Sequence, residues 1–418
     1  MSCYLGRLFI VFFQVFITMS LSPSSIRASD LFELTVDIPG ETASRSFSRI
    51  EDFIEQLSND EFNNLFLTYQ DNVTQADAVL NIRSIPAQAN YAANSPVLNF
   101  QVPSVGINIS FAGATRDESE DLFLEWFKGE GRDLLTKLLQ EFVAKTPTDP
   151  VAGNPNSLMS GMVSSDFLLG GGYFNSSSSA QSGEESGEDD TNLIGIGVHY
   201  GHASSLGFKS DVVTLPLNYI WTLSKPGWAV IIDAPLTYIN IEDSEAYHGS
   251  LGLGLRIPLL GRRWAITPMF RAGITGSRDI GSAAIIYSGS LTSNFNLYFG
   301  DIKLSLNNMV GYYRTDSIKI GDYDIEYDLE NEVFRNGFSL EGSLNWTLLD
   351  DPTSWELAFV DTRFIGDDLF LDNYNEVALS FGTRRRTNRM TWQSLRLGAQ
   401  YTFGDDYDGY QVTLNYRF

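Results

Sequence analysis

The last nine residues, Tyr410-Gln-Val-Thr-Leu-Asn-Tyr-Arg-Phe418, alternate apolar and polar side chains without a break. Successive side chains of a β-strand point to opposite faces of the sheet, so one face carries Tyr410, Val412, Leu414, Tyr416 and Phe418. The other face carries only polar side chains. A transmembrane barrel strand needs an apolar outer face, a polar inner face and aromatic residues near the membrane edge. An edge strand of a soluble β-sandwich would alternate in the same way, so the rest of the chain must decide.

The composition suits a barrel better than a bundle of membrane helices. The 418 residues are 43% hydrophobic and 13% aromatic, and only alternate residues of a barrel strand face lipid. The formal net charge is -24. This charge argues against a nucleic-acid partner, because phosphate contacts need lysine and arginine.

The N-terminus has the pattern of a secretory signal peptide over residues 1–28. Arg7 precedes an apolar run from Leu8 to Leu21, and small residues lead up to a plausible cleavage site near Ala28. We therefore expect export through the Sec translocon. Cys3 is the only cysteine and would leave with the signal, so we expect neither disulfides nor thiolate chemistry.

Residues 30–145 have the pattern of a small α/β domain. Strand-like alternation occurs over 31–38, 79–85 and 97–111, and helical spacing occurs over 48–69 and 118–144. Residues 146–190 are expected to form a linker. It would begin with a Pro/Gly-rich stretch to Pro155, continue with a short helix over 156–164 capped by Asn156, and end in a Ser-rich, then acidic segment over 176–190.

From residue 191 to residue 418 the apolar period is two almost everywhere. The segments amount to about 12 antiparallel strands, an even number as bacterial barrels require. Counting back from Phe418, the connections should alternate between short inner ones and longer outer ones. The expected outer connections are 404–409, 366–375, 314–336, 242–248, 276–281 and a short one near Ser204. This outer set is acid-rich, whereas the inner set includes basic stretches at 261–263 and 384–389. A soluble sandwich has no reason to sort loop charge in this way. The sequence thus predicts a mainly β protein, a transmembrane barrel preceded by a small α/β domain.

These residues together resemble the β-barrel domain of bacterial autotransporters. The resemblance covers about residues 153–418 and rests on the strand number, the terminal Tyr-Arg-Phe and the segment from Gly153 to Met159 before the barrel. It implies a helix inside the pore, for which 156–164 is the counterpart, and a C-terminal signal read by the barrel-assembly machinery. The chain departs from the family because no long repetitive passenger precedes the barrel. It is more similar to the solitary type of barrel, which lacks a large passenger.

The alternation also predicts which charged side chains point into the lumen, since charges face lipid only at a cost of about 2–4 kcal/mol for Arg or Lys at midplane. Both signs occur, so these groups can pair across the interior. They could brace the lumen, or they could hold the pore helix and tune ion passage. The predicted lumen charges are Asp233, Arg256, Arg271, Lys303, Glu341, Glu356, Glu376, Arg384 and Arg396.

The sequence offers little enzyme or metal chemistry, and we expect no catalytic residue, no metal and no cofactor. His202-Ala-Ser204 is similar to the His-x-Ser pair of outer-membrane lipid A deacylases, but no acid is expected to complete a triad. The three histidines show no convergence of the kind that a metal site requires.

Two functions therefore remain open for an outer-membrane barrel surrounded by lipid, which we expect to be a monomer. The barrel could translocate or display its own N-terminal domain. Alternatively, it could be a structural or channel-forming barrel whose N-terminal domain stays in the periplasm. An outer-membrane enzyme is the weakest of the hypotheses.

Overall fold

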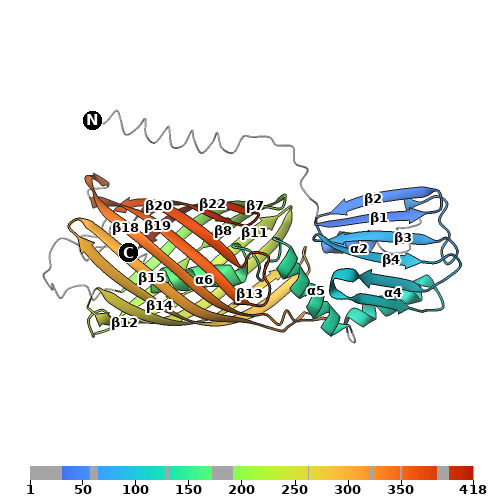
Figure 1. Ribbon diagram of the computed structural model, residues 1–418, viewed down its shortest axis with the longest axis horizontal. Helices are drawn as coiled ribbons and strands as arrows, with labels where there is room; N and C mark the ends of the chain where they lie inside the picture. The colour runs from blue at the N-terminus through green and yellow to red at the C-terminus, as the bar shows by residue number, and fades with distance from the viewer. Residues whose placement is uncertain are drawn as a thin grey trace, which may run out of the picture.

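The computed structural model describes residues 31–56, 65–128, 131–171, 192–261, 263–320, 323–348, 351–383 and 395–417. The expected signal peptide, the Ser-rich and acidic segment 176–190, Arg384 and Phe418 lie outside the described residues. The fold is mainly β and has two parts, a small β/α region and a closed 12-strand antiparallel barrel. The two parts are arranged end to end (Figure 1). Among the described residues, no helix is long and apolar enough to cross a membrane.

The N-terminal region is a six-stranded antiparallel sheet in the order β2-β1-β3-β4-β5-β6. Its elements are β1 (Phe32–Ile38), β2 (Glu41–Phe47), α2 (Ile50–Gln56), β3 (Ala76–Ile82), β4 (Ile85–Tyr91), β5 (Leu98–Val102), the 3-10 helix η1 (Pro103–Val105), β6 (Ile107–Phe111), α4 (Arg116–Lys128) and α5 (Arg132–Lys145). Helix α2 contacts β1 and β2, α4 contacts β5 and β6, and α5 contacts β4. Phe32, Leu34 and Val36 alternate with exposed or half-buried residues and fill the core.

Two strands of this sheet were not expected from the sequence. The edge strand β2 has no buried residue and therefore no apolar alternation. Strand β4 contains Pro86, which normally counts against a strand. The helix expected over 48–69 is described only over Ile50–Gln56, and residues 57–64 lie outside the described part.

The barrel sheet closes because the last strand pairs with the first, β22 with β7. Its 14 strand segments make 12 strands, since β8 continues into β9 beyond Pro216 and β10 continues into β11 beyond Pro235. The segments are β7 (Leu193–Ser205), β8 (Phe208–Leu215), β9 (Leu217–Thr222), β10 (Ala229–Asp233), β11 (Leu236–Ile241), β12 (Ser244–Leu260), β13 (Trp264–Ser277), β14 (Ser282–Phe299), β15 (Ile302–Asp316), β18 (Glu330–Leu348), β19 (Asp351–Gly366), β20 (Asn373–Thr383), β21 (Arg396–Gly404) and β22 (Tyr407–Arg417). A hairpin of β16 (Ile318–Ile320) and β17 (Tyr323–Ile325) lies in the connection between β15 and β18.

We call the end where β22 finishes the inner end of the barrel, and the opposite end the outer end. The outer connections are at the expected places, but three of them are two-residue turns because the strands extend further than the sequence suggested. These turns are Leu206-Gly207, Glu242-Asp243 and Asp405-Asp406. Both residues of the first two turns have positive φ, which is typical of the type I′ turns that suit the twist of a hairpin.

The interior of the barrel has two zones, where the sequence predicted a polar lumen throughout. In the outer half many inward-facing side chains are apolar and buried, interspersed with Ser, Thr and Asn, and the apolar ones belong to the same hydrophobic cluster as the N-terminal sheet. We call this zone the apolar seal, and its barrel residues include Ala203, Val212, Ile239, Ile241, Ala246, Ile286, Val333, Phe364, Tyr374 and Tyr407. In the inner half the buried side chains are mostly Ser, Thr, Asn and charged residues.

The stretch from Thr146 to Pro155, which was expected to begin a linker, is a mostly buried junction. Val151 and Ala152 are 0% exposed and belong to the apolar seal. The amide of Asn154 donates to the Asp149 carbonyl at 2.7 Å, and the carboxylate of Asp149 accepts from the Val151 N–H at 2.8 Å. These local hydrogen bonds satisfy the polar backbone and let the segment pack inside the barrel mouth.

Candidate functional site

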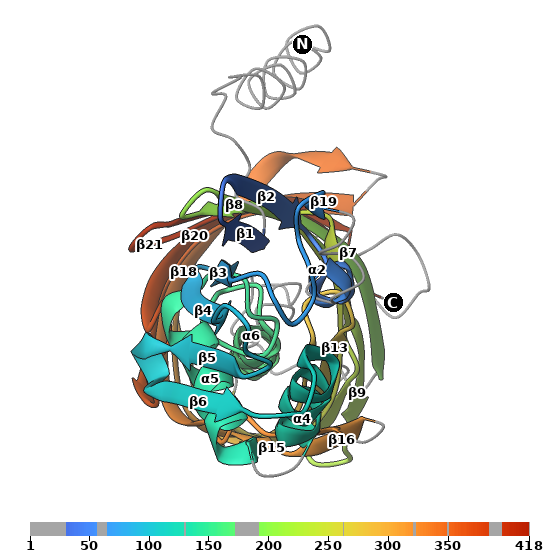
Figure 2. The ribbon, with the colours of Figure 1, turned by 90° about the vertical axis from the view of Figure 1, so that its right-hand side faces the viewer.

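A single helix, α6 (Leu158–Gly170), lies inside the ring of barrel strands (Figure 2). It is longer than the helix expected over 156–164, because Phe167, Leu168 and Leu169 continue it. Its N-cap is Ser157 and not Asn156. The Ser157 hydroxyl accepts a hydrogen bond from the Ser160 N–H, whereas the Asn156 side chain donates to Ser210 of β8 at 3.0 Å.

Asp166 fixes α6 to one wall of the barrel. Its Oδ1 atom accepts a 2.7 Å hydrogen bond from Nε of Arg271, and both side chains are 0% exposed. Its Oδ2 atom accepts hydrogen bonds of 3.0 Å from the hydroxyls of Ser290 and Tyr313. Arg271 also pairs with Asp233 at 2.8 Å. A buried network of this kind is costly to break, because any lost partner leaves a charge buried in a medium of low dielectric.

The other predicted lumen charges mostly lie in pairs. Lys303 and Glu341 are 2.7 Å apart, and Arg396 and Glu356 are 3.7 Å apart. Glu376 pairs with Arg335, whose guanidinium also lies 5.1 Å from the ring centre of Phe167 on α6. Arg256 is half-buried, and its Nη1 atom has no hydrogen-bond partner among the described residues.

Two members of these networks were missed by sequence reasoning. Asp166 lies just beyond the expected end of the pore helix at residue 164. Arg335 falls in the stretch 314–336, which was interpreted as a loop, although β18 already begins at Glu330. Arg335 alternates with the outward-facing Phe334 and lies on the same inward face as Ser339. This alternation could have identified Arg335 as a lumen charge.

Glycines allow α6 to approach the wall formed by β12 to β15 closely. A Cβ atom on Gly273 of β13 would lie 2.6 Å from the sulfur of Met162. A Cβ atom on Gly170 at the end of α6 would lie 2.5 Å from the side chain of Thr292 on β14. The helix therefore leans against this wall.

On the opposite side of α6 a cavity of about 310 Å³ remains. The helix presents Gly161, Ser164, Ser165 and Leu168 to it, which are the least buried positions of α6. Strands β19 to β22 and β7 provide the facing wall with polar side chains that include His199, Glu356, Glu376, Arg396, Gln400, Gln411, Thr413 and Asn415. The cavity borders the apolar seal at Tyr374 and Tyr407.

A buried ion pair joins the N-terminal domain to the junction and the barrel. Arg83, from the turn between β3 and β4, donates to Asp149 at 2.7 Å and to Ser282 of β14 at 3.2 Å. The Arg83 guanidinium also lies 4.5 Å from the ring centre of Phe142 on α5. Burial raises the pKa of Tyr327 well above its usual range, so its hydroxyl stays protonated and donates to Asp149 at 3.2 Å.

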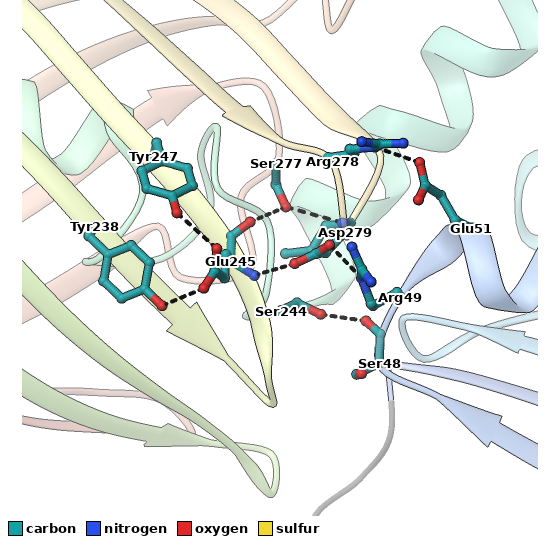
Figure 3. Close-up of polar contacts among 11 residues, drawn as sticks. Ser48, Arg49, Glu51, Tyr238, Ser244, Glu245, Tyr247, Ser277, Arg278 and Asp279 are labelled. Carbon is teal, nitrogen blue, oxygen red and sulfur yellow. Dashed lines mark hydrogen bonds and ion pairs between the residues drawn. The ribbon is translucent and has the colours of Figure 1, made fainter.

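A second contact, which we call the rim latch, joins the start of α2 to two outer turns (Figure 3). The guanidinium of Arg49 pairs with Asp279 at 2.8 Å, and the Ile50 N–H donates to the Asp279 carbonyl at 2.7 Å. Arg278 pairs with Glu51 at 2.6 Å, and the Ser244 hydroxyl donates to the carbonyl of Ser48. Burial raises the pKa of Asp279, but the hydrogen bonds from the Glu245 N–H and from Arg49 outweigh burial and hold that pKa below its usual range.

The predicted girdle residues of β22 point away from the lumen. Tyr410 and Leu414 are exposed, and Val412 and Tyr416 are partly exposed. Tyr410 stacks on Tyr401 of β21 with 4.9 Å between ring centres.

The histidines lie apart from one another, and His202 has an acidic neighbour that the sequence did not reveal. The Nδ1 atom of His202 lies 3.0 Å from Asp211 of β8, because β7 and β8 pair these two residues directly. Among the described residues no hydrogen bond joins His202 to Ser204. No group of three metal-binding side chains is found in the part of the chain that the structure describes.

No family profile matches the chain, and no curated protein matches it. Solved structures do match. The β domain of the Bordetella autotransporter BrkA is 11% identical, and the match covers 55% of this chain and 99% of that one with a TM-score of 0.43. The translocator domain of the autotransporter NalP from Neisseria meningitidis is 11% identical over 62% of this chain and 96% of that one, with a TM-score of 0.42.

An outer-membrane channel from Pseudomonas putida F1 is also 11% identical, with 57% of this chain and 99% of that chain covered and a TM-score of 0.37. This chain resembles the autotransporter type of outer-membrane barrel. At these identities the likeness concerns the fold alone.

Proposed function

We propose that the barrel translocates its own N-terminal domain and then displays it as a fixed cap outside the outer membrane. The course of the chain carries this proposal. The N-terminal domain docks on the outer turns, α6 runs through the lumen, and β7 begins beside Arg417 at the inner end. A chain that has been threaded outward through its own barrel has this arrangement.

The loop charges and the C-terminal strand support the assignment of the inner end to the periplasm. Lys225 and Arg263 lie in inner connections, whereas Asp243, Asp367 and Asp405 lie in outer ones. The proposal implies export by the Sec translocon and insertion by the barrel-assembly machinery.

The apolar seal argues against an open channel. Val151 and Ala152 from the junction, with Leu158 and Met159 from α6, pack against inward-facing residues of the strands. Ions cross a dry apolar constriction only with difficulty. The cavity beside α6 is the one observation that favours the channel hypothesis, and it ends against this seal.

The docking contacts argue that the displayed domain stays in place. A tethered passenger would need few contacts with the barrel, whereas this domain shares a hydrophobic cluster, the Arg83–Asp149 pair and the rim latch with it. We therefore propose a cap and not a released product.

Labelling of single cysteines on intact cells tests the proposal. Ser110 of β6 and Ser224 of the inner turn between β9 and β10 are both exposed, and each would be replaced by cysteine. A membrane-impermeant maleimide should label Ser110→Cys on intact cells and Ser224→Cys only after permeabilisation. The reverse pattern would support the alternative, a channel or structural barrel with a periplasmic N-terminal domain.

A further inference from the structure

Four polar side chains form a continuous row on the outward face of the barrel, where lipid would lie. They are Asn308 of β15, Asn336 of β18, Asp361 of β19 and Asn375 of β20. The strand register pairs each directly with the next. Asn308 and Asn336 are exposed, and Asp361 and Asn375 are partly exposed.

Apolar side chains flank this row on both sides along the strands. On β15 the outward neighbours of Asn308 are Leu306 and Val310, and Tyr312 lies one outward position beyond. On β18 the outward neighbours of Asn336 are Phe334 and Phe338. Asn308 lies six residues from Ile302 at the inner end of β15 and four from Tyr312. At about 3.3 Å per residue and a tilt near 45°, this places it close to the middle of an apolar band about 25 Å tall.

The row descends through the bilayer because the strands are tilted. Asn375 lies two residues from the outer end of β20, and Asn308 lies eight residues from the outer end of β15. The polar row therefore runs from the outer membrane interface at Asn375 to near the bilayer centre at Asn308.

The described residues satisfy only part of the hydrogen-bonding capacity of this row. Nδ2 of Asn308 donates to Oδ1 of Asn336 at 2.7 Å, and Asp361 pairs with Arg363 on its own strand at 3.1 Å. The side-chain amides of Asn308 and Asn336 make no further side-chain hydrogen bond within the described part of the chain. Hydrocarbon offers no partner for the remaining donors and acceptors, so another polar surface must cover them.

We propose that a second copy of this chain meets this row at the paired amides of Asn308 and Asn336, in a homodimer with its twofold axis along the membrane normal and Asn336 nearest that axis, where the inclined rows of the two copies cross. A twofold interface brings the same patch together from both copies, so the patch must be complementary to itself. Amides meet this condition because each carries both donors and an acceptor. The patch also contains the carboxylate of Asp361 and the guanidinium of Arg363, so its formal charge is balanced. This proposal replaces the expectation of a monomer, and it is independent of the proposed display function.

Cross-linking in the outer membrane tests the geometry. Phe338→Cys lies one outward position from Asn336 and keeps the polar row intact, and Leu217→Cys on β9 faces outward on the opposite side of the barrel. A short bis-maleimide should link the Phe338→Cys protein into dimers and leave the Leu217→Cys protein monomeric. Equal cross-linking of the two variants, or none with Phe338→Cys, would contradict the proposal.

Subunit counting in vesicles of phosphatidylethanolamine and phosphatidylglycerol tests the chemistry. In single-molecule photobleaching, the fluorescence of each labelled full-length complex should disappear in two steps. The double variant Asn308→Leu/Asn336→Leu should dimerise at least about tenfold more weakly, while its heat-dependent gel shift shows that the barrel is folded. A wild-type monomer, or a dimer that the double variant leaves unchanged, would overturn the proposal. A monomer that retains lipopolysaccharide only when the two asparagines are present would identify a lipid as the occupant and would equally overturn it.

Discussion

The Nε atom of Arg271 lies 2.7 Å from the Oδ1 atom of Asp166, and neither side chain has any exposed area. This contact joins the lumen helix to the barrel wall at a point where water cannot replace a lost partner. It explains how a helix with one acidic and no basic residue is held inside a barrel.

Replacing Asp166 should therefore lower the stability of the barrel with its helix in place. Asp166→Leu leaves Asp233 as the carboxylate that pairs with Arg271 and leaves the Tyr313 hydroxyl without its acceptor, so we expect a loss of about 3 kcal/mol. Calorimetry in detergent measures this loss. Ser165→Ala on the cavity side of the same helix is the matched control and should change little. A similar effect of the two substitutions would argue against a special role for the Asp166 network.

The pair of Lys303 and Glu341 should brace the lumen and not regulate ion flow. Glu341→Ala leaves the Lys303 ammonium without its partner at 2.7 Å, and we expect a lower unfolding temperature and a loss of about 2 kcal/mol. The apolar seal lies elsewhere in the lumen, so the conductance in planar bilayers should stay as low as that of the wild type. A rise in conductance at unchanged stability would favour a gating role.

Two glycines near the lumen should respond to alanine in opposite directions. Gly153 has φ of 91°, and a Cβ there would lie 2.4 Å from the Val143 carbonyl. We expect Gly153→Ala to destabilise the junction by about 2 kcal/mol and to make the N-terminal domain easier for proteases to remove. Gly161 in α6 meets nothing within 4 Å at the Cβ position, so Gly161→Ala should stabilise the helix by up to about 1 kcal/mol. Limited proteolysis and thermal melting of both variants would show whether the signs differ.

The rim latch should weaken in acid. Because the folded-state pKa of Asp279 lies below its ordinary value of 3.8, its contribution is fully present above the unfolded-state pKa and is lost as the pH falls through the folded-state pKa. Arg49 is about half exposed, so solvent screens the pair and the contribution is small. Asp279→Asn should make release of the N-terminal domain by protease faster at pH 7, and the difference from the wild type should shrink as the pH falls below 3.8. A difference that stays constant over this pH range would mean that the carboxylate charge is not responsible.

The barrel could be predicted from the sequence because its signal is local and repeated. Each strand alternates on its own, as Tyr410 to Phe418 does, and the charge of the connections distinguishes the two ends. The strand ends were less predictable. The acidic turns at Asp405-Asp406 and Glu242-Asp243 suggested loops, although the paired strands run almost up to them.

The candidate site was harder to predict because it depends on contacts between distant segments. The Pro/Gly-rich composition of 146–155 indicated a linker, and nothing in it shows that Val151 would be buried by the barrel mouth. Asn308 and Asp361 interrupt apolar faces in single strands, and only the register shows that they form one row. Asp166 gains its importance from Arg271, which is 105 residues away in the chain.

The hydrophobic cluster shared by the N-terminal sheet and the outer barrel has a consequence for the order of folding. Val143 and Val151 belong to one buried cluster with barrel residues such as Ile286. If the N-terminal domain crosses the lumen as proposed, it therefore lacks part of its core while it is in transit. The barrel would then supply the missing contacts on the far side, and the free energy that they release would favour outward movement over return.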